Sequence, residues 1–130
     1  MIDLTCKKEV ASLTYQEKVA ALDKALGWLN KRYPSKYVKV KTDYVDKPYV
    51  MKKGIGGFII QDQLTFNITV AVGRDISYAM NTLFHEYKHL LQVAWDGKLY
   101  GQIGKAEEAE ALQFSISEMN KYVDDVGYDW

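Results

Sequence analysis

Residues 76–95 read ISYAMNTLFHEYKHLLQVAW, and this stretch decides how the chain can fold. At about 100° per residue, its apolar side chains gather on one side of a helix: Ile76, Met80, Leu83, Tyr87, Leu90, Leu91 and Ala94. Asp75 can cap the start of the helix, and Asp96-Gly97 can end it. The spacing therefore predicts a helix from Asp75 to about Trp95 with one core face.

The other side of this helix carries both histidines of the chain, in the sequence His85-Glu86-Tyr87-Lys88-His89. Residues four apart lie one turn above each other, so two imidazoles can bind one zinc ion beside the carboxylate of Glu86. The neighbours on that side are polar: Tyr78, Asn81, Thr82, Gln92 and Asp96. We therefore predict that the histidines lie off the core face as metal ligands. Two unliganded surface histidines would give the same pattern and remain the alternative.

A zinc site of this kind needs a third protein ligand and an open position. The chain has only two histidines, so the third ligand must be a carboxylate, and Glu107, Glu108 and Glu110 lie at the start of the last predicted helix. Glu108 lies about 50° from the centre of the predicted apolar stripe, and the other two about 150° from it. That stripe is Ala109, Leu112, Ile116, Met119 and Val123. Glu108 is therefore predicted as the ligand, whereas Glu107 and Glu110 fit solvated acids near a helix N-terminus.

The first helix of the chain is predicted to begin at Thr14. The sequence Thr14-Tyr15-Gln16-Glu17 matches a capping box, in which a hydroxyl and a carboxylate each pair with a free backbone N–H. Apolar residues then recur at helical spacing until Pro34: Val19, Leu22, Leu26, Leu29 and Tyr33. These residues predict an amphipathic helix with one core face.

Three strands and a final helix complete the predicted elements. Apolar and polar residues alternate from Tyr37 to Thr42, which predicts a half-buried strand. The apolar runs Phe58–Gln61 and Leu64–Val72 predict a hairpin, after a loop over Asp46–Gly57 that is rich in glycine. The last helix is predicted from Lys105 to Tyr122.

Together these elements predict an α+β domain. It has an N-terminal helix, a three-stranded and mostly antiparallel sheet, the HExxH helix and a C-terminal helix that carries the third ligand. A chain of 130 residues has room for one compact core, so we predict a single domain over residues 1–130.

Composition and charge exclude several classes of partner. Lysine plus arginine and aspartate plus glutamate both total 17, so no net charge favours nucleic acid or an anionic membrane. No run approaches the roughly 18 apolar residues that cross a bilayer. Cys6 is the only cysteine, which excludes an internal disulfide and favours a reducing cytoplasm. We expect a cytoplasmic protein with a protein or peptide partner, and the oligomeric state stays open.

HEYKH, followed by Glu108-Ala109-Glu110-Ala111-Leu112-Gln113-Phe114-Ser115, resembles the gluzincin metallopeptidases. It is most similar to the small ImmA/IrrE-like zincins, whose second motif looks like ExEAxxFA. In that family the glutamate that opens ExxA is the third zinc ligand, and the resemblance assigns this role to Glu108. The resemblance covers Thr82 to about Ser115 and implies a minimal zincin-like domain. Leu112 departs from the asparagine or aspartate of many relatives, and Ser115 from the usual alanine.

The resemblance implies a zinc metallopeptidase. Zn²⁺ would be held by His85, His89 and Glu108, and Glu86 would be the general base. Relatives cleave helix-turn-helix repressors, so the implied substrate is a regulatory protein.

Other parts of the chain could assist the reaction. Tyr78 and Tyr100 are candidates to stabilise an oxyanion, with a packing role as the alternative for each. The strand Leu64–Val72 would border the cleft and pair with an extended substrate. The loop Asp46–Gly57 would close over the site or serve as a plain connector.

Two other functions remain as alternatives. A zinc-stabilised binding or inhibitor domain without turnover fits the ligands, although structural zinc does not need a general base such as Glu86. A structural component of a phage or mobile element with a chance motif is the other, and absence of bound zinc would favour it. The donor set also accepts manganese, cobalt or iron.

Overall fold

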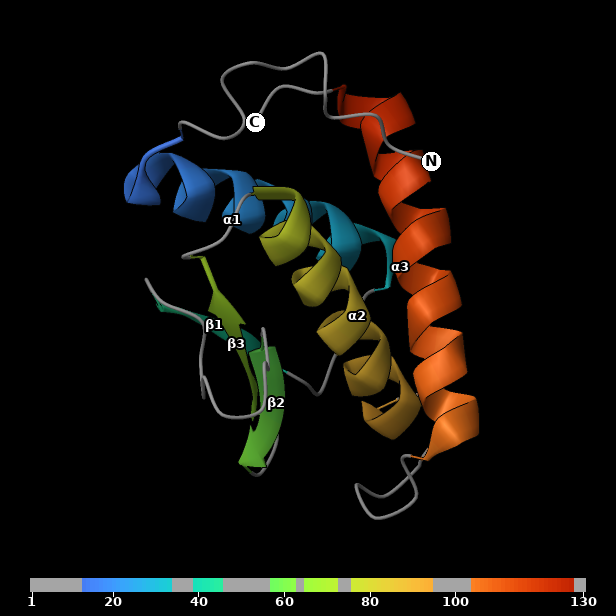
Figure 1. Ribbon diagram of the computed structural model, residues 1–130. Helices are drawn as coiled ribbons and strands as arrows, with labels where there is room; N and C mark the ends of the chain where they lie inside the picture. The colour runs from blue at the N-terminus through green and yellow to red at the C-terminus, as the bar shows by residue number, and fades with distance from the viewer. Residues whose placement is uncertain are drawn as a thin grey trace.

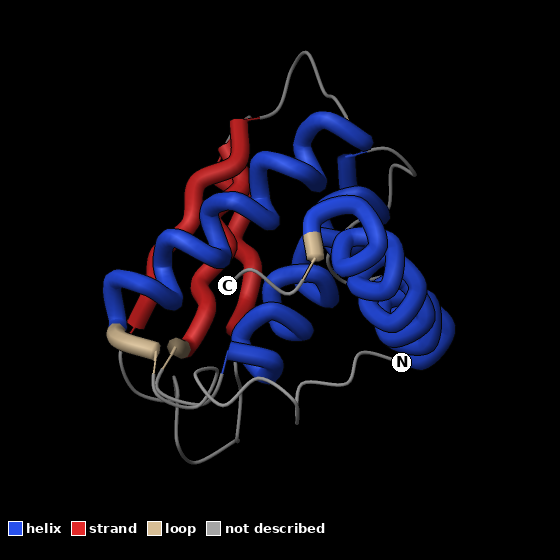
Figure 2. The backbone as a smooth tube through the Cα atoms, turned by 90° about the horizontal axis from the view of Figure 1, so that it is seen from above, coloured by secondary structure: helices blue, strands red, loops and turns tan. Residues whose placement is uncertain are grey.

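The computed structural model describes residues 13–33, 39–45, 57–62, 65–72, 76–94 and 104–127. Within these residues the elements follow the order α1 (Tyr15–Arg32), β1 (Lys39–Val45), β2 (Gly57–Asp62), β3 (Thr65–Ala71), α2 (Ile76–Ala94) and α3 (Lys105–Val126). Helix α2 runs between the sheet and α3 (Figure 1), and a view from above places the strands and α3 on opposite sides (Figure 2). No helix in the described ranges is long and apolar enough to cross a membrane.

Helix α1 begins where the capping box predicts. The Thr14 hydroxyl accepts from the Glu17 N–H at 3.2 Å, and the Glu17 carboxylate accepts from the Thr14 N–H at 3.0 Å. The helix ends at Arg32 with Tyr33 as its C-cap, while Pro34 lies outside the described residues. Its buried face consists of Ala21, Leu22, Ala25 and Leu29.

Helix α2 is the central element of the core. Six residues of its predicted core face are confirmed as buried, each at most 4% exposed: Ile76, Met80, Leu83, Tyr87, Leu90 and Leu91. Its ends lie within one residue of the predicted limits, and the proposed cap Asp75 is outside the described residues. The prediction rested on the 3.6-residue period, which is strongest where one face is buried along the whole helix.

An aromatic cluster joins the three helices next to the histidine motif. The Trp28 ring of α1 lies 6.2 Å from the Phe84 ring of α2 and 5.3 Å from the Tyr122 ring of α3, measured between centroids. Phe84 and Tyr122 are 5.9 Å apart in an edge-on arrangement, which aromatic quadrupoles favour. Because Phe84 directly precedes His85, this cluster fixes the position of the helix at the motif.

The expected fold class, a minimal zincin-like α+β domain around a mostly antiparallel sheet, is wrong. Helices of 18, 19 and 22 residues dominate the described chain, against strands of 7, 6 and 7. The strand order is β1-β3-β2, with β1 parallel to β3 and β2 antiparallel to it. Alternation indicates a strand and its faces, but not which strand takes the centre, and a long enough connection allows parallel pairing.

The predicted apolar stripe of α3 is wrong for three of its five residues, whereas Met119 is buried as predicted. Leu112 and Ile116 are each 50% exposed and Ala109 is exposed, whereas the buried residues are Ala111, Ser115, Glu118, Met119 and Tyr122. Small side chains let α3 approach α2 closely, and Glu118 is buried because α1 supplies partners for its carboxylate. The helix continues to Val126, four residues beyond the predicted end.

Candidate metal centre

The two histidines of α2 lie on consecutive turns, as their spacing predicts. Their ring centroids are 4.9 Å apart and their planes are inclined by 80°. The side chain of His85 is 27% exposed, and that of His89 is 7% exposed. The sequence places both histidines off the apolar core face, and neither belongs to the hydrophobic core cluster; His89 is nevertheless buried, because α3 covers this part of α2.

Glu108, in the first turn of α3, reaches both histidines. Its Oε2 lies 3.1 Å from Nε2 of His85, and its Oε1 lies 2.9 Å from Nε2 of His89. The three candidate ligand atoms all lie within 4.8 Å of one another. The structure thus brings together the three side chains that the sequence predicts as ligands, from two separate helices.

The position of Glu108 follows from the observed buried face of α3. Ala111 and Ser115 lie three and seven residues after Glu108, which is the spacing of one helix face. Glu108 therefore continues the face that packs on α2, at the end where the packing opens to solvent. Its side chain is 55% exposed, so the cluster is accessible from this side.

Burial and charge change the acidity of the motif. Burial lowers the pKa of His85, and the neighbouring His89 adds to this effect, while Glu108 opposes it. Burial raises the pKa of Glu86 to about 8, with a further contribution from the negative charge of Glu108. In the absence of a cation, the interior of this site therefore disfavours charge on both an acid and a base.

A residue without an assigned role in the sequence, Gln92, completes the cluster. It is fully buried, and its Oε1 lies 2.7 Å from Nδ1 of His89. Its Nε2 donates to the carbonyl of Glu107 at 2.9 Å and to the carboxylate of Glu110 at 3.0 Å. The available signal was its spacing, three residues after His89 on the histidine side of α2.

Glu107 and Glu110, which the sequence predicts as solvated acids, both make hydrogen bonds in the structure. The Glu107 carboxylate accepts from the backbone N–H of Gly104 at 2.9 Å, at the N-terminus of α3. Glu110 is exposed but hydrogen-bonded to Gln92. Both help to hold the first turn of α3 beside α2.

The structure describes only some of the residues that the sequence predicts to assist the reaction. Tyr78 is partly buried in α2, two turns before His85 and about 10 Å from it along the helix axis. Tyr100 and residues 46–56 of the loop lie outside the described residues. Strand β3 pairs with β1 on one edge and with β2 on the other, so its edges cannot take an extended substrate. The prediction of substrate pairing along Leu64–Val72 is therefore wrong.

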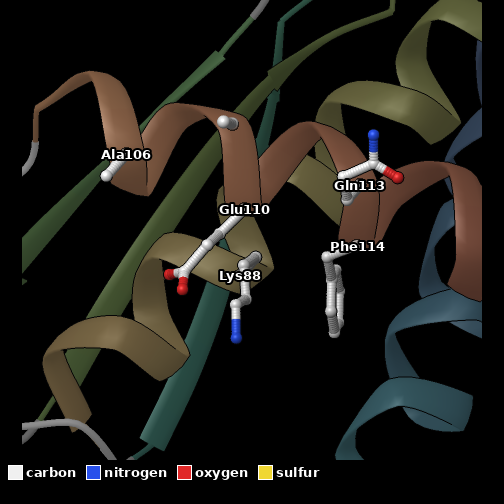
Figure 3. A pocket seen from close by; sticks show the side chains of 6 residues that line it. Lys88, Ala106, Glu110, Gln113 and Phe114 are labelled. Atoms are coloured by element: carbon white, nitrogen blue, oxygen red, sulfur yellow. The ribbon is translucent and has the colours of Figure 1, made fainter.

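A hollow of about 420 Å³ lies between side chains of α2 and α3. Its described lining residues are Lys88, Ala106, Ala109, Glu110, Gln113 and Phe114, several of which Figure 3 shows around it. None of the three candidate ligands is among them. The hollow is thus distinct from the ligand atoms but lies close to them, since its lining includes Lys88, next to His89, and Ala109, next to Glu108.

Comparisons with known proteins identify no relative of this chain. The chain matches no known family model, no curated protein and no solved structure. The assignment of a function therefore depends on the cluster of His85, His89 and Glu108 and on the chemistry that its atoms allow.

Proposed function

We propose that this protein is a zinc metallopeptidase of the gluzincin type, with His85, His89 and Glu108 as ligands. The observation that carries the proposal is the 2.9 Å contact between Oε1 of Glu108 and Nε2 of His89. That nitrogen is buried and has no hydrogen-bond partner. A positive charge between the two atoms would make the contact favourable, and two imidazoles with one carboxylate form a common ligand set of catalytic zinc.

The donor set suits an ion, but the side chains must rearrange to bind it, because the three candidate ligand atoms are spread over up to 4.8 Å. With zinc bonds of about 2.1 Å and tetrahedral angles, two ligand atoms lie roughly 3.4 Å apart. The contacts of Glu108 with the two histidines, 3.1 and 2.9 Å, are a few tenths of an ångström shorter than this. Because Glu108 is half exposed, its side chain can move outward by that amount.

The chemistry assigned to the site is peptide hydrolysis. A divalent cation held by His85, His89 and Glu108 would supply Lewis acidity to the peptide carbonyl and would make a water molecule acidic enough to attack. Glu86 would take a proton from that water and deliver it to the leaving nitrogen as the C–N bond breaks. Burial is the larger cause of the raised pKa of Glu86, about 8, and the charge of Glu108 adds to it; a cation beside Glu108 would offset the second cause and lower this pKa.

The substrate and compartment belong to the same proposal. The gluzincin resemblance supports a protein substrate, with a regulatory repressor as the class that relatives cleave. The single cysteine, Cys6, supports a reducing cytoplasm. We assign no substrate pairing to β3, since both of its edges are occupied.

The test compares the wild-type protein with Glu86→Gln. Both should bind one equivalent of zinc, measured by elemental analysis after dialysis. Cleavage of unstructured peptides and repressor proteins, followed by mass spectrometry, should fall by at least roughly 100-fold in the variant, because a general base contributes that much. Asp124→Asn, which makes the same acid-to-amide change at an exposed position of α3, should cleave as the wild type does.

Each other result has a defined meaning. Absence of bound zinc in the wild type would overturn the proposal and favour a chance motif. Equal cleavage by Glu86→Gln would overturn the role of Glu86. Bound zinc without cleavage of any tested protein would favour a zinc-stabilised binding domain.

A further inference from the structure

Gln92 is a fully buried polar side chain with three partners on two helices. It lies in the last turns of α2, and its amide contacts His89 on its own helix and the first turns of α3. A buried amide costs free energy unless its donors and acceptor are paired. In Gln92 both the amide nitrogen and the amide oxygen are paired.

The partners of the amide determine its orientation. The Glu107 carbonyl and the Glu110 carboxylate can only accept hydrogen bonds, so the group that faces them must be the Gln92 NH₂. The oxygen of the amide then faces Nδ1 of His89 at 2.7 Å. Because an amide oxygen only accepts, Nδ1 of His89 must carry the proton.

A neutral imidazole protonated on Nδ1 has its lone pair on Nε2. Nε2 of His89 is the atom that lies 2.9 Å from Glu108 and has no hydrogen-bond partner. Gln92 therefore presents this nitrogen as a metal ligand. The same amide holds the backbone of Glu107, which immediately precedes Glu108.

We infer that Gln92 is a positioning residue that selects the metal-binding tautomer of His89 and fixes the turn of α3 that carries Glu108. This inference rests on the proposed metal site. A residue that only fills space between the helices would be replaceable by an apolar side chain of similar size. A positioning residue is not, since leucine at this place has no acceptor for the Nδ1 proton and no donor for α3.

The tautomer of His89 is the first measurement, made by ¹⁵N NMR on metal-free protein at neutral pH. The wild type should carry the proton on Nδ1. Gln92→Leu should shift His89 toward the Nε2-protonated form, because that proton gains the nearby Glu108 carboxylate as its acceptor. Gln92→Glu keeps an acceptor opposite Nδ1 and should retain the wild-type tautomer, and Gln113→Leu, an exposed glutamine of α3, should leave it unchanged.

Zinc affinity is the second measurement, made by competition with a chelator. Loss of a hydrogen bond to a metal-ligating histidine typically weakens metal affinity roughly 10- to 100-fold, and we expect this for Gln92→Leu. In Gln92→Glu the new carboxylate faces that of Glu110, so Gln92→Glu combined with Glu110→Gln should bind zinc more tightly than Gln92→Glu alone. Circular dichroism identifies any variant that does not fold.

The results separate the inference from the proposed function. An Nε2-protonated His89 in the wild type, or zinc affinity in folded Gln92→Leu equal to that of the wild type, would overturn the role of Gln92. If neither the wild type nor any variant binds zinc, the proposed metal site is wrong. The tautomer of His89 in metal-free protein still decides whether Gln92 orients this side chain.

Discussion

Two glutamates of α3, ten residues apart, face the other helices and differ in their partners. Glu118 is 3% exposed, and its Oε1 accepts from the Tyr33 hydroxyl and from Nη2 of Arg32 at 3.3 Å. Glu108 is 55% exposed, and its two oxygens face imidazole nitrogens of His85 and His89. If burial alone were the criterion, Glu118 would be the candidate functional carboxylate. The partners indicate Glu108 instead, because its oxygens face two imidazole nitrogens.

The difference separates a structural carboxylate from a candidate ligand. Hydroxyl and guanidinium groups are donors, so the negative charge of Glu118 is stabilised by the protein itself. In the tautomer inferred for His89, Nε2 is an acceptor, as a carboxylate oxygen is, and two acceptors in contact need a proton or another cation between them. The same helix thus joins α1 through an ion pair between a carboxylate oxygen and two donors, and joins α2 through contacts that a cation would complete; among the described residues, the second oxygen of Glu118 has only Lys121, at 3.8 Å.

The largest effect that tests this comparison is stabilisation by zinc. Zinc at 1,000 times its Kd should stabilise the wild-type fold by about 4 kcal/mol, because it binds the folded state. Glu108→Gln should lose most of this increment, and Glu118→Gln should keep it despite a lower stability of its own. Urea unfolding with zinc or with a chelator measures both, and an equal increment in Glu108→Gln would place the ion elsewhere.

An intermediate loss of stability is expected when one of the donors to Glu118 is removed. Tyr33→Phe removes one hydroxyl and leaves a buried carboxylate oxygen with Arg32 alone, which should lower the free energy of unfolding by about 1 to 3 kcal/mol. Zinc affinity should not change.

Tyr15→Phe is the matched control for this experiment. The Tyr15 hydroxyl donates to the Tyr44 carbonyl at 2.9 Å in an exposed position, so its removal should change stability by no more than about 0.5 kcal/mol. If Tyr33→Phe cost as little as Tyr15→Phe, the buried pair of Glu118 would contribute nothing that an exposed hydrogen bond does not.

The sequence predicts α2 and its motif well because one rule governs that helix throughout. A single period sorts its residues into a core face and a histidine face, and four-residue spacing places His85 and His89 on consecutive turns. The beginning of α1 was equally predictable, since a capping box is a local interaction. Local rules suffice where the partners lie within one turn of each other.

Packing between elements was less predictable. The apolar stripe of α3 was assigned to Leu112 and Ile116, but the helix buries Ala111 and Ser115, which allow close approach to α2. Glu108 was chosen by its angle to the wrong stripe, and its agreement with the structure depends on the motif that the resemblance supplied. The central place of β3 depends on the path of the connections, which alternation does not encode.

A third glutamate gives the smallest effect, because its partners are backbone donors at the surface. Glu17 accepts from the Thr14 N–H, and this hydrogen bond, with that of the Thr14 side chain, holds the pKa of Glu17 below its usual value of 4.5. A lowered pKa means that the folded state favours the ionised form, so this stabilisation is present above about pH 4.5 and is lost as the pH falls through the folded pKa. Thr14→Ala should cost about 1 kcal/mol near neutral pH.

This cost should shrink on acidification, because the Thr14 side chain also favours ionised Glu17, and that part of its contribution is lost when Glu17 is protonated. Urea unfolding of the wild type and Thr14→Ala at about pH 7 and about pH 3 measures the change. Glu17→Gln, which retains an acceptor without a titrating charge, should approach the wild type at the lower pH. A difference between wild type and Glu17→Gln that grew on acidification would contradict the sign, and would mean that Glu17 is stabilised in its protonated form, unlike a carboxylate that accepts backbone hydrogen bonds.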